Sequence, residues 1–152
     1  MRRVRQGACV VMLLAASCSN HTQGPLQRID FQTGSGTVST GRLPVADTDS
    51  ERERGLMNVT QLAPDLGMLF LFDGPTQSAF WMKDTVIPLS VAFWSGDGTV
   101  TDIIDMQPCV RDPCPTYPPA HTYVAALEMN LGWFQTHGVE IGDHAVWAEQ
   151  SR

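Results

Sequence analysis

The sequence predicts a mainly β protein, a single compact antiparallel β-barrel or sandwich-like domain with two short helices. Several short apolar stretches are separated by turn segments, and only two stretches carry helix signals. The chain has 152 residues, and removal of a 17-residue leader would leave 135, enough for one hydrophobic core. We therefore expect a signal peptide at 1–17, a short polar tether at 18–26 and one β-rich domain at 27–150.

The N-terminus has the layout of a lipoprotein signal. Arg2, Arg3 and Arg5 precede an apolar run over 7–17, roughly half the ~20 residues that a membrane-spanning helix needs. Small residues then lead into Cys18, whose thiol would take a diacylglycerol group and whose amine would take a palmitate-like chain. Two chains make a stable membrane anchor. The alternative is an ordinary secretory signal cleaved nearby, and both interpretations place the domain outside the cytoplasm.

The charge balance argues against a nucleic-acid partner. Without the three leader arginines, 7 basic residues face 16 acidic ones. Such a surface repels phosphate backbones, and no basic stripe is present. The glycines also lack the spacing of nucleotide-binding loops, so no nucleotide cofactor is expected.

Cys109 and Cys114 form a pair in a proline-rich segment. An even pair outside the cytoplasm predicts a disulfide. The competing hypothesis is zinc ligation by both cysteines with His121, His137 or His144, but zinc sites usually use tighter C-x-x-C spacing. We therefore predict no metal site.

The first half of the domain contains strand, turn and helix signals in succession. Short strands are expected at 27–31 and 43–45, around a glycine-rich segment that permits turns. Capping residues and acids over 47–53 predict a helix that ends near Met57. The stretches 68–72 and 79–82 are apolar, and we expect them to be neighbouring central strands.

The second half predicts a hairpin, a strand, a helix and a last strand. Residues 89–94 alternate in period 2, and the turn 95–98 leads into 100–104. A strand follows at 122–127. A short helix is expected over 130–137, with Asn130 as its cap and Gly138 as its stop. A turn at 141–143 leads into a final strand through Val146.

Polar candidates gather around Lys83, the chain's only lysine, which follows the apolar stretch 79–82. A cation held between aromatic and acidic groups could recognise a carboxylate or a sugar. The alternative is an exposed lysine with an ordinary ion pair of ~0.2–1 kcal/mol. The candidate ligand-binding residues are Arg54, Trp81, Lys83, Asp84, Thr85 and Glu128.

Two further hypotheses are a hydrolase and a copper-binding protein. A hydrolase would use Lys83 as base or electrostatic stabiliser with Glu128 or Asp84 as its acid partner, but no hydroxyl has an adjacent histidine, so no catalytic residue is assigned. Copper would need grouped thioethers, whereas the methionines are scattered among apolar strands and suit core packing. These are Met57, Met68, Met82, Met106 and Met129.

Several separate motifs follow one another along the chain: Arg54-Gly55-Leu56-Met57, Gly67-Met68-Leu69-Phe70, Phe80-Trp81-Met82-Lys83 with Thr85, Ile87-Pro88-Leu89, Leu127-Glu128 with Gly132, and Gly142-Asp143. In this order they resemble the motifs of the bacterial and archaeal family known as domain of unknown function 192. The resemblance covers about residues 42–147 and implies a compact, mainly β, often exported domain without an agreed activity. Two positions depart from the pattern: Asp84 stands where the family usually has asparagine, and Ser90 where it usually has aspartate.

Together these observations predict an extracytoplasmic lipoprotein, tethered to the membrane through Cys18. Its domain is expected to be a noncatalytic binding module for a small envelope ligand or glycan. The sequence does not indicate an oligomeric state.

Overall fold

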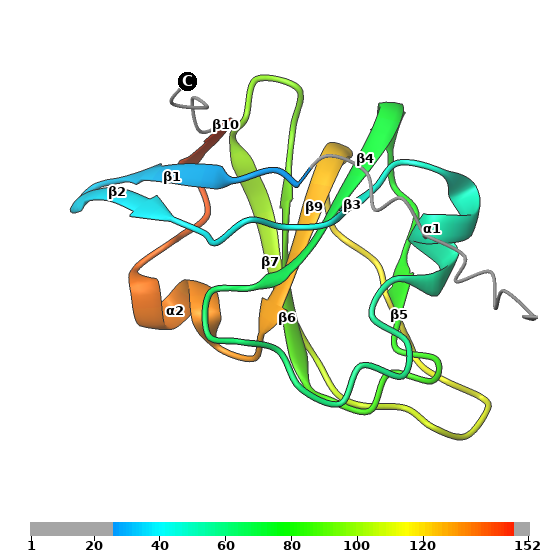
Figure 1. Cartoon of the computed structure of the whole chain (residues 1–152). Helices are drawn as coiled ribbons and strands as arrows, with labels where there is room; N and C mark the ends of the chain where they lie inside the picture. Colours follow the sequence, from blue (N-terminus) through cyan, green and yellow to red (C-terminus); the bar gives the residue numbers. More distant parts are fainter. Residues whose placement is uncertain (1–25, 148–152) are drawn as a thin grey trace, which may run out of the picture.

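The computed structural model describes residues 26–147. The predicted signal peptide, Cys18 and nearly all of the tether lie outside these residues. Ten strands and two helices follow one another in the described part (Figure 1). Their bounds are β1 Ile29–Thr33, β2 Gly36–Ser39, β3 Val45–Ala46, α1 Asp49–Arg54, β4 Gly67–Thr76, β5 Phe80–Trp81, β6 Leu89–Trp94, β7 Val100–Met106, β8 Thr116–Tyr117, β9 Tyr123–Asn130, α2 Trp133–His137 and β10 His144–Trp147.

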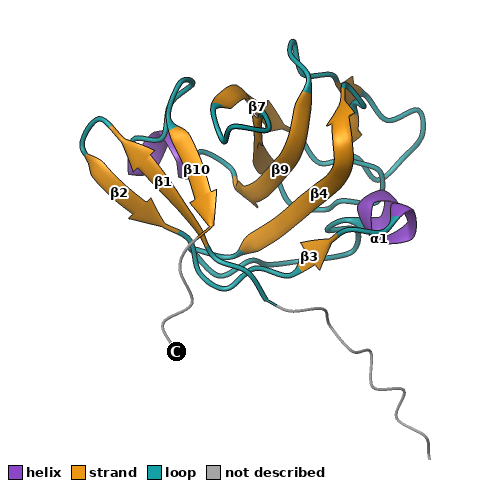
Figure 2. Ribbon diagram, turned by 90° about the horizontal axis from the view of Figure 1, so that it is seen from above, coloured by secondary structure: helices purple, strands orange, loops and turns teal. Residues whose placement is uncertain are grey.

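A five-stranded sheet in the order β3-β4-β9-β6-β7 forms the middle of the molecule. A three-stranded sheet, β10-β1-β2, and helix α2 lie on one side of it, and helix α1 and strand β5 lie on the other (Figures 1 and 2). The architecture is therefore sandwich-like rather than a closed barrel. The mainly β fold with two short helices is confirmed, although β3 pairs with β4 in parallel.

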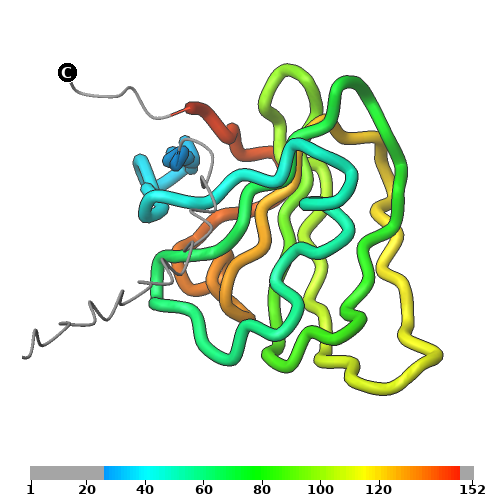
Figure 3. The backbone as a smooth tube through the Cα atoms, turned by 45° about the vertical axis from the view of Figure 1, so that its right-hand side comes forward, coloured from blue at the N-terminus to red at the C-terminus, as the bar shows by residue number. Residues whose placement is uncertain are grey.

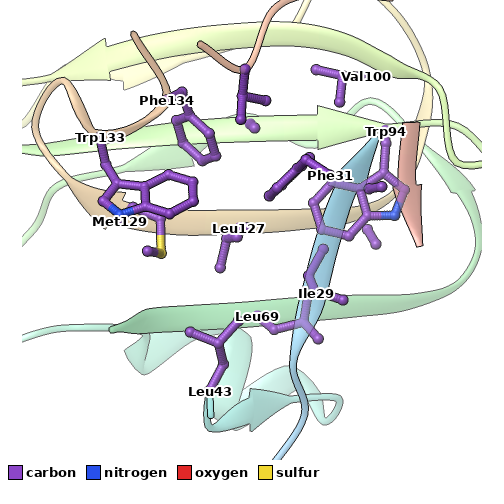
Figure 4. Close-up of a cluster of buried hydrophobic side chains, with 14 residues drawn as sticks. Ile29, Phe31, Leu43, Leu69, Trp94, Val100, Leu127, Met129, Trp133 and Phe134 are labelled. Atoms are coloured by element: carbon purple, nitrogen blue, oxygen red, sulfur yellow. The ribbon is translucent and has the colours of Figure 1, made fainter. Parts of the chain in front are cut away.

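Both faces of the central sheet are covered by apolar side chains, because successive side chains of a strand point to opposite faces. Leu127 and Met129 of β9 face one cluster, together with Phe31 of β1 and Phe134 of α2 (Figure 4). The second cluster lies on the opposite face. It contains Phe70 of β4, Ala126 of β9, Phe93 of β6 and Phe80 of β5.

The expected pairing of 68–72 with 79–82 is wrong. Residues 68–72 belong to β4, whose neighbours are β3 and β9, whereas β5 pairs only with β8. The two stretches meet through side chains instead, because the rings of Phe70 and Phe80 lie 5.0 Å apart. The second stretch is apolar because Phe80 and Met82 cover a face of the central sheet.

The hairpin prediction is confirmed, since β6 and β7 pair antiparallel. The helix expected over 130–137 begins later, at Trp133, after Gly132. Asn130 is the last residue of β9 and donates a side-chain hydrogen bond to the carbonyl of Ala63 at 3.1 Å, so it does not cap the helix. Gly138 ends the helix with a φ of 69°, as predicted.

Helix α1 is held at its start by a capping box. The Thr48 hydroxyl accepts a hydrogen bond from the backbone N–H of Glu51, whose carboxylate accepts one from the N–H of Thr48. We expect Thr48→Ala to lower the free energy of unfolding by about 1 kcal/mol, measured by urea denaturation. Ser50→Ala, which keeps both bonds, is the control, and an equal loss in both variants would contradict this role of Thr48.

Candidate functional site

A pocket of about 340 Å³ opens between helix α1, strand β5 and the face of the central sheet formed by β4 and β9. Figure 3 shows the backbone segments of these elements, from the helix in cyan-green to β9 in yellow-orange. The pocket is lined by Asp49, Arg52, Glu53, Arg54, Gly55, Leu56, Met57, Phe70, Phe72, Ser78, Ala79, Phe80, Trp81, Lys83, Thr85, Tyr123 and Glu128.

Glu128 is the buried acid of this pocket. It lies opposite Met68 of β4 and Val91 of β6, in the middle of the central sheet, and only 4% of it is exposed. Burial raises the pKa of Glu128 to about 8, because leaving water disfavours the charged form. Within residues 26–147 no hydrogen bond or ion pair engages its carboxyl group. The side chain therefore presents a polar group to the pocket that no described residue of the protein binds.

Gly55 keeps the space next to this carboxyl open. It ends helix α1 with a φ of 45°, a backbone conformation that favours glycine. A Cβ atom at this position would lie 3.3 Å from the ring of Phe70 and 3.8 Å from Oε2 of Glu128. The motif Arg54-Gly55 thus both turns the chain and leaves room beside the acid.

Aromatic side chains form much of the pocket wall. Phe70 packs against Phe80, and Phe72 packs edge-on against Tyr123 at 5.1 Å between ring centroids. The Tyr123 hydroxyl donates to the carbonyl of Ser78 at 2.7 Å, and burial raises the pKa of Tyr123 to about 12. Its phenol therefore stays neutral and holds the segment before β5 in place.

The basic side chains of the pocket have different roles. Arg52 donates to the carbonyl of Leu71 at 2.7 Å, pairs with Asp49 and lies over the Phe72 ring at 5.1 Å, so it fixes α1 to β4. Arg54 and Lys83 make no ion pair within the described residues. The Lys83 ammonium lies 5.3 Å from the centre of the Trp81 ring.

Five of the six predicted residues line the pocket: Arg54, Trp81, Lys83, Thr85 and Glu128. Thr85 is buried, and its hydroxyl donates to the carbonyl of Lys83 at 3.3 Å, so it shapes the turn that carries the lysine. The sequence argument missed Arg52, Phe72 and Tyr123. The alternation of Phe70 and Phe72 along one strand was the one available signal for Phe72.

Asp84 does not line the pocket. It has a φ of 53°, and its carbonyl accepts a hydrogen bond from the backbone N–H of Asn58 at 2.9 Å. Asparagine and aspartate tolerate this left-handed conformation better than most residues. This backbone conformation suits the aspartate of this chain and would equally suit the asparagine that the family resemblance implies, and within residues 26–147 no ion pair joins Asp84 to Lys83.

Ser90, the second departure from the family pattern, is a buried connector. Its hydroxyl donates to Asp105 of β7 at 2.5 Å and accepts from the backbone N–H of Gly132 at 2.8 Å. It therefore joins β7 to the turn before α2 and lies outside the pocket.

The predicted disulfide is present between Cys109 and Cys114, with 5.8 Å between their Cα atoms. The backbone of Cys109 also forms isolated β-bridges with the backbone of Lys83 and of Thr85. Its N–H donates a hydrogen bond to the carbonyl of Thr85 at 3.1 Å. The disulfide-closed loop thus braces the turn that presents Lys83. Because the two sulfur atoms are bonded to each other, they are not free thiolates for zinc.

The alternative metal ligands are also separated or otherwise engaged. Met82 and Met106 are fully buried in one apolar cluster, and Met129 in the other. His121 contacts Asp102 at 3.2 Å. Burial by itself would raise the pKa of Asp102, but hydrogen bonds from the Ala120 amide, Thr101 and His121 hold that pKa below its usual value. Between residues 26 and 147, no three His, Cys, Asp or Glu residues are grouped to hold a metal ion.

None of the helices in the described part of the chain is long and apolar enough to cross a membrane.

Comparisons with known proteins agree with the motifs. The profile of DUF192, a family described as uncharacterized ACR, matches residues 31–147. A crystal structure described as a candidate transcription regulator from Sinorhizobium meliloti 1021 is 33% identical, with a TM-score of 0.73, and the match covers 80% of this chain and 92% of that one. A protein of unknown function from Novosphingobium aromaticivorans DSM 12444 is 32% identical, with a TM-score of 0.72, and the match covers 93% of this chain and all of the other. No curated protein matches. The chain therefore belongs to the DUF192 family.

Proposed function

We propose that this protein is an extracytoplasmic, membrane-anchored lipoprotein whose domain binds a small envelope ligand or glycan without transforming it. The observation that carries the proposal is the pocket itself. It places a buried acid, a half-buried lysine beside an exposed tryptophan, and a wall of aromatic rings around one cavity. Ligand sites typically combine an apolar wall with a few converging polar groups, at volumes of roughly 300–1,000 Å³.

Two features favour binding over hydrolysis. Within residues 26–147 no hydrogen bond joins Lys83 to Glu128, so the acid and base of the hydrolase hypothesis are not paired. Ser78 and Thr85 line the pocket, but in this part of the chain neither hydroxyl contacts a histidine. A serine or threonine nucleophile is commonly activated by such a base within hydrogen-bond reach. The enzyme hypothesis would require substrate turnover that Glu128→Ala abolishes.

The proposed location is supported by the leader and by the disulfide, because disulfides persist mainly outside the cytoplasm. Mass spectrometry of the protein extracted from a membrane fraction tests it. We expect a chain that begins at Cys18 and carries acyl chains, with Cys109 and Cys114 oxidised. An uncleaved leader on a soluble product would contradict the anchor.

Binding is tested with a panel of envelope metabolites and glycans against the purified domain. We expect at least one ligand whose affinity falls about tenfold or more in Lys83→Ala, since a hydrogen bond to a charged group contributes about 1.5–3 kcal/mol. Arg42→Ala is the control. This substitution also removes one positive charge, but Arg42 is exposed and does not line the pocket. A panel without any ligand that depends on Lys83 would overturn the proposed function.

Lys83 also provides a direct readout, because the chain contains no other lysine. In the domain purified without the lipidated Cys18, reductive methylation with ¹³C-formaldehyde labels this side chain and the N-terminal amine. A ligand that occupies the pocket should shift the Lys83 signal and leave the signal of the N-terminal amine unchanged.

A further inference from the structure

The carboxyl group of Glu128 faces the pocket without a protein partner among the described residues. Only 4% of the residue is exposed, it lines the pocket, and within residues 26–147 it makes no side-chain hydrogen bond or ion pair. Burying an unpartnered polar group costs free energy, and buried charges in proteins are normally paired. The group that pairs with Glu128 is therefore expected to come from the ligand.

The surroundings of Glu128 favour a positively charged group. Five aromatic side chains line the same cavity, and aromatic faces attract ammonium groups within about 6 Å of the ring centre. An acid combined with aromatic rings is the kind of environment that recognises amines and quaternary ammonium compounds. The five are Phe70, Phe72, Phe80, Trp81 and Tyr123.

Two basic side chains of the pocket, Arg54 and Lys83, can attract a negatively charged group, although the acid Glu53 of α1 also lines it. Arg54 is exposed, Lys83 is half-buried, and neither makes an ion pair within residues 26–147. Arg52, by contrast, is already held by Asp49 and by backbone carbonyls. A ligand with only positive charge would meet repulsion from Arg54 and Lys83, whereas an anionic group would be attracted to them.

We propose that the pocket takes a small zwitterion, an ammonium compound that also carries a carboxylate or another anionic group. The ammonium group lies against Glu128 and the aromatic rings, and the anionic group lies toward Arg54 and Lys83. Amino acids and betaines have this chemistry and a size that suits a pocket of about 340 Å³. The inference rests on the proposed binding function and narrows its ligand class.

The test compares zwitterions with analogues that carry one of the two charges. The zwitterions are the common amino acids, glycine betaine and phosphocholine. Calorimetry is also run with phenethylamine and 3-phenylpropanoate as the single-charge analogues of phenylalanine, and with tetramethylammonium and acetate as those of glycine betaine. We expect at least one of the zwitterions to bind about tenfold or more tightly than its single-charge analogues.

Two variants separate the two ends of the ligand. Glu128→Gln keeps the size of the side chain and should weaken binding of the zwitterion and of its ammonium analogue by about 10–100-fold, while leaving the carboxylate analogue unchanged. Lys83→Ala should instead weaken the binding of the zwitterion and of its carboxylate analogue. Arg42→Ala should change none of these affinities.

The pH dependence gives an independent readout. In the free protein Glu128 holds its proton up to about pH 8, so an ammonium group that pairs with it releases that proton to the solvent. The affinity should then rise about tenfold per pH unit between pH 6 and 8 in the wild type and stay flat in Glu128→Gln. The other titratable or charged side chains around the pocket are Asp49, Arg52, Glu53 and Arg54 of α1, Lys83 after β5, and Tyr123 of β9.

The outcomes distinguish this inference from the broader function. If no zwitterion binds below about 10 mM, or if Glu128→Gln binds the best zwitterion as tightly as the wild type, the inference is overturned. If a neutral sugar binds and its binding depends on Lys83, the inference of a zwitterionic ligand is overturned, but the proposed binding function is supported. If no compound of either panel binds, both fail.

Discussion

The Glu128→Gln protein is expected to be more stable than the wild type at neutral pH, by on the order of 3 kcal/mol at pH 7. Burial raises the pKa of Glu128 to about 8 in the folded protein, from 4.5 for a free glutamate. Below about pH 4.5 the acid is protonated in both the folded and the unfolded chain, so Glu128 does not lower the stability of the wild type there. As the pH rises toward 8, the unfolded chain releases the proton while the folded chain keeps it, so the contribution of Glu128 to wild-type stability becomes increasingly unfavourable.

The difference between the two proteins should therefore be near zero at pH 4, grow through neutral pH and level off above pH 8. Urea denaturation at several pH values measures it. Glu140→Gln is the matched control, because Glu140 is exposed and most exposed substitutions change stability by about 0.5 kcal/mol or less. A difference that does not change with pH would show that solvent or a partner already satisfies the carboxyl group.

An acid that lowers the stability of its own fold is expected where function requires it. The neighbours of Glu128 across the sheet are Met68 and Val91, and an apolar residue would fit the same position. Glu128 thus lowers the stability of the fold at neutral pH and provides a polar group inside an apolar cavity. This polar group links the fold to the proposed ligand.

Local patterns in the sequence predicted the elements that depend on neighbouring residues. The alternation over 89–94 and the turn after it specify the β6–β7 hairpin, and the capping residues before Glu51 specify the start of α1. Both kinds of signal act within a few residues. The disulfide was also predicted, since Cys109 and Cys114 are the even pair of cysteines left in the domain once the predicted leader and the proposed lipidation site Cys18 are set aside.

Long-range pairing could not be read from composition. Residues 68–72 and 79–82 are equally apolar, yet one is a central strand and the other covers that sheet from outside. Apolar runs indicate burial and do not indicate the partner. The parallel pairing of Val45 with Leu69 was hidden for the same reason.

The candidate site was predicted in part. The motifs around Arg54, Trp81 and Glu128 indicated one polar cluster, and all three residues line the pocket. Tyr123 was missed because its role depends on the β4–β9 register. Asp84 was included because it adjoins Lys83, but its backbone conformation directs it elsewhere.

Gly67→Ala is expected to destabilise the fold severely, by more than about 3 kcal/mol. Gly67 begins β4 and pairs with Met129 of β9. A Cβ atom at this position would lie 1.8 Å from the backbone oxygen of Glu128 and 2.7 Å from the sulfur of Met129. The methionine side chain can move, but the oxygen belongs to a central strand paired on both sides, so β4 and β9 must separate there.

Gly74→Ala is the matched control, because Gly74 lies in the same strand and an added Cβ would meet nothing within 4 Å. Its stability should stay within about 1 kcal/mol of the wild type. Thermal and urea unfolding of the three proteins measure the contrast, and equal stabilities of the two variants would contradict the close approach of β4 to β9.

The clash falls on the carbonyl of Glu128 itself, so any Gly67→Ala protein that folds should also bind pocket ligands more weakly, whereas Gly74→Ala should bind them normally. Gly67 is thus required both for the fold and for the site. The close contact that lets β4 pair with β9 also sets the position of Glu128.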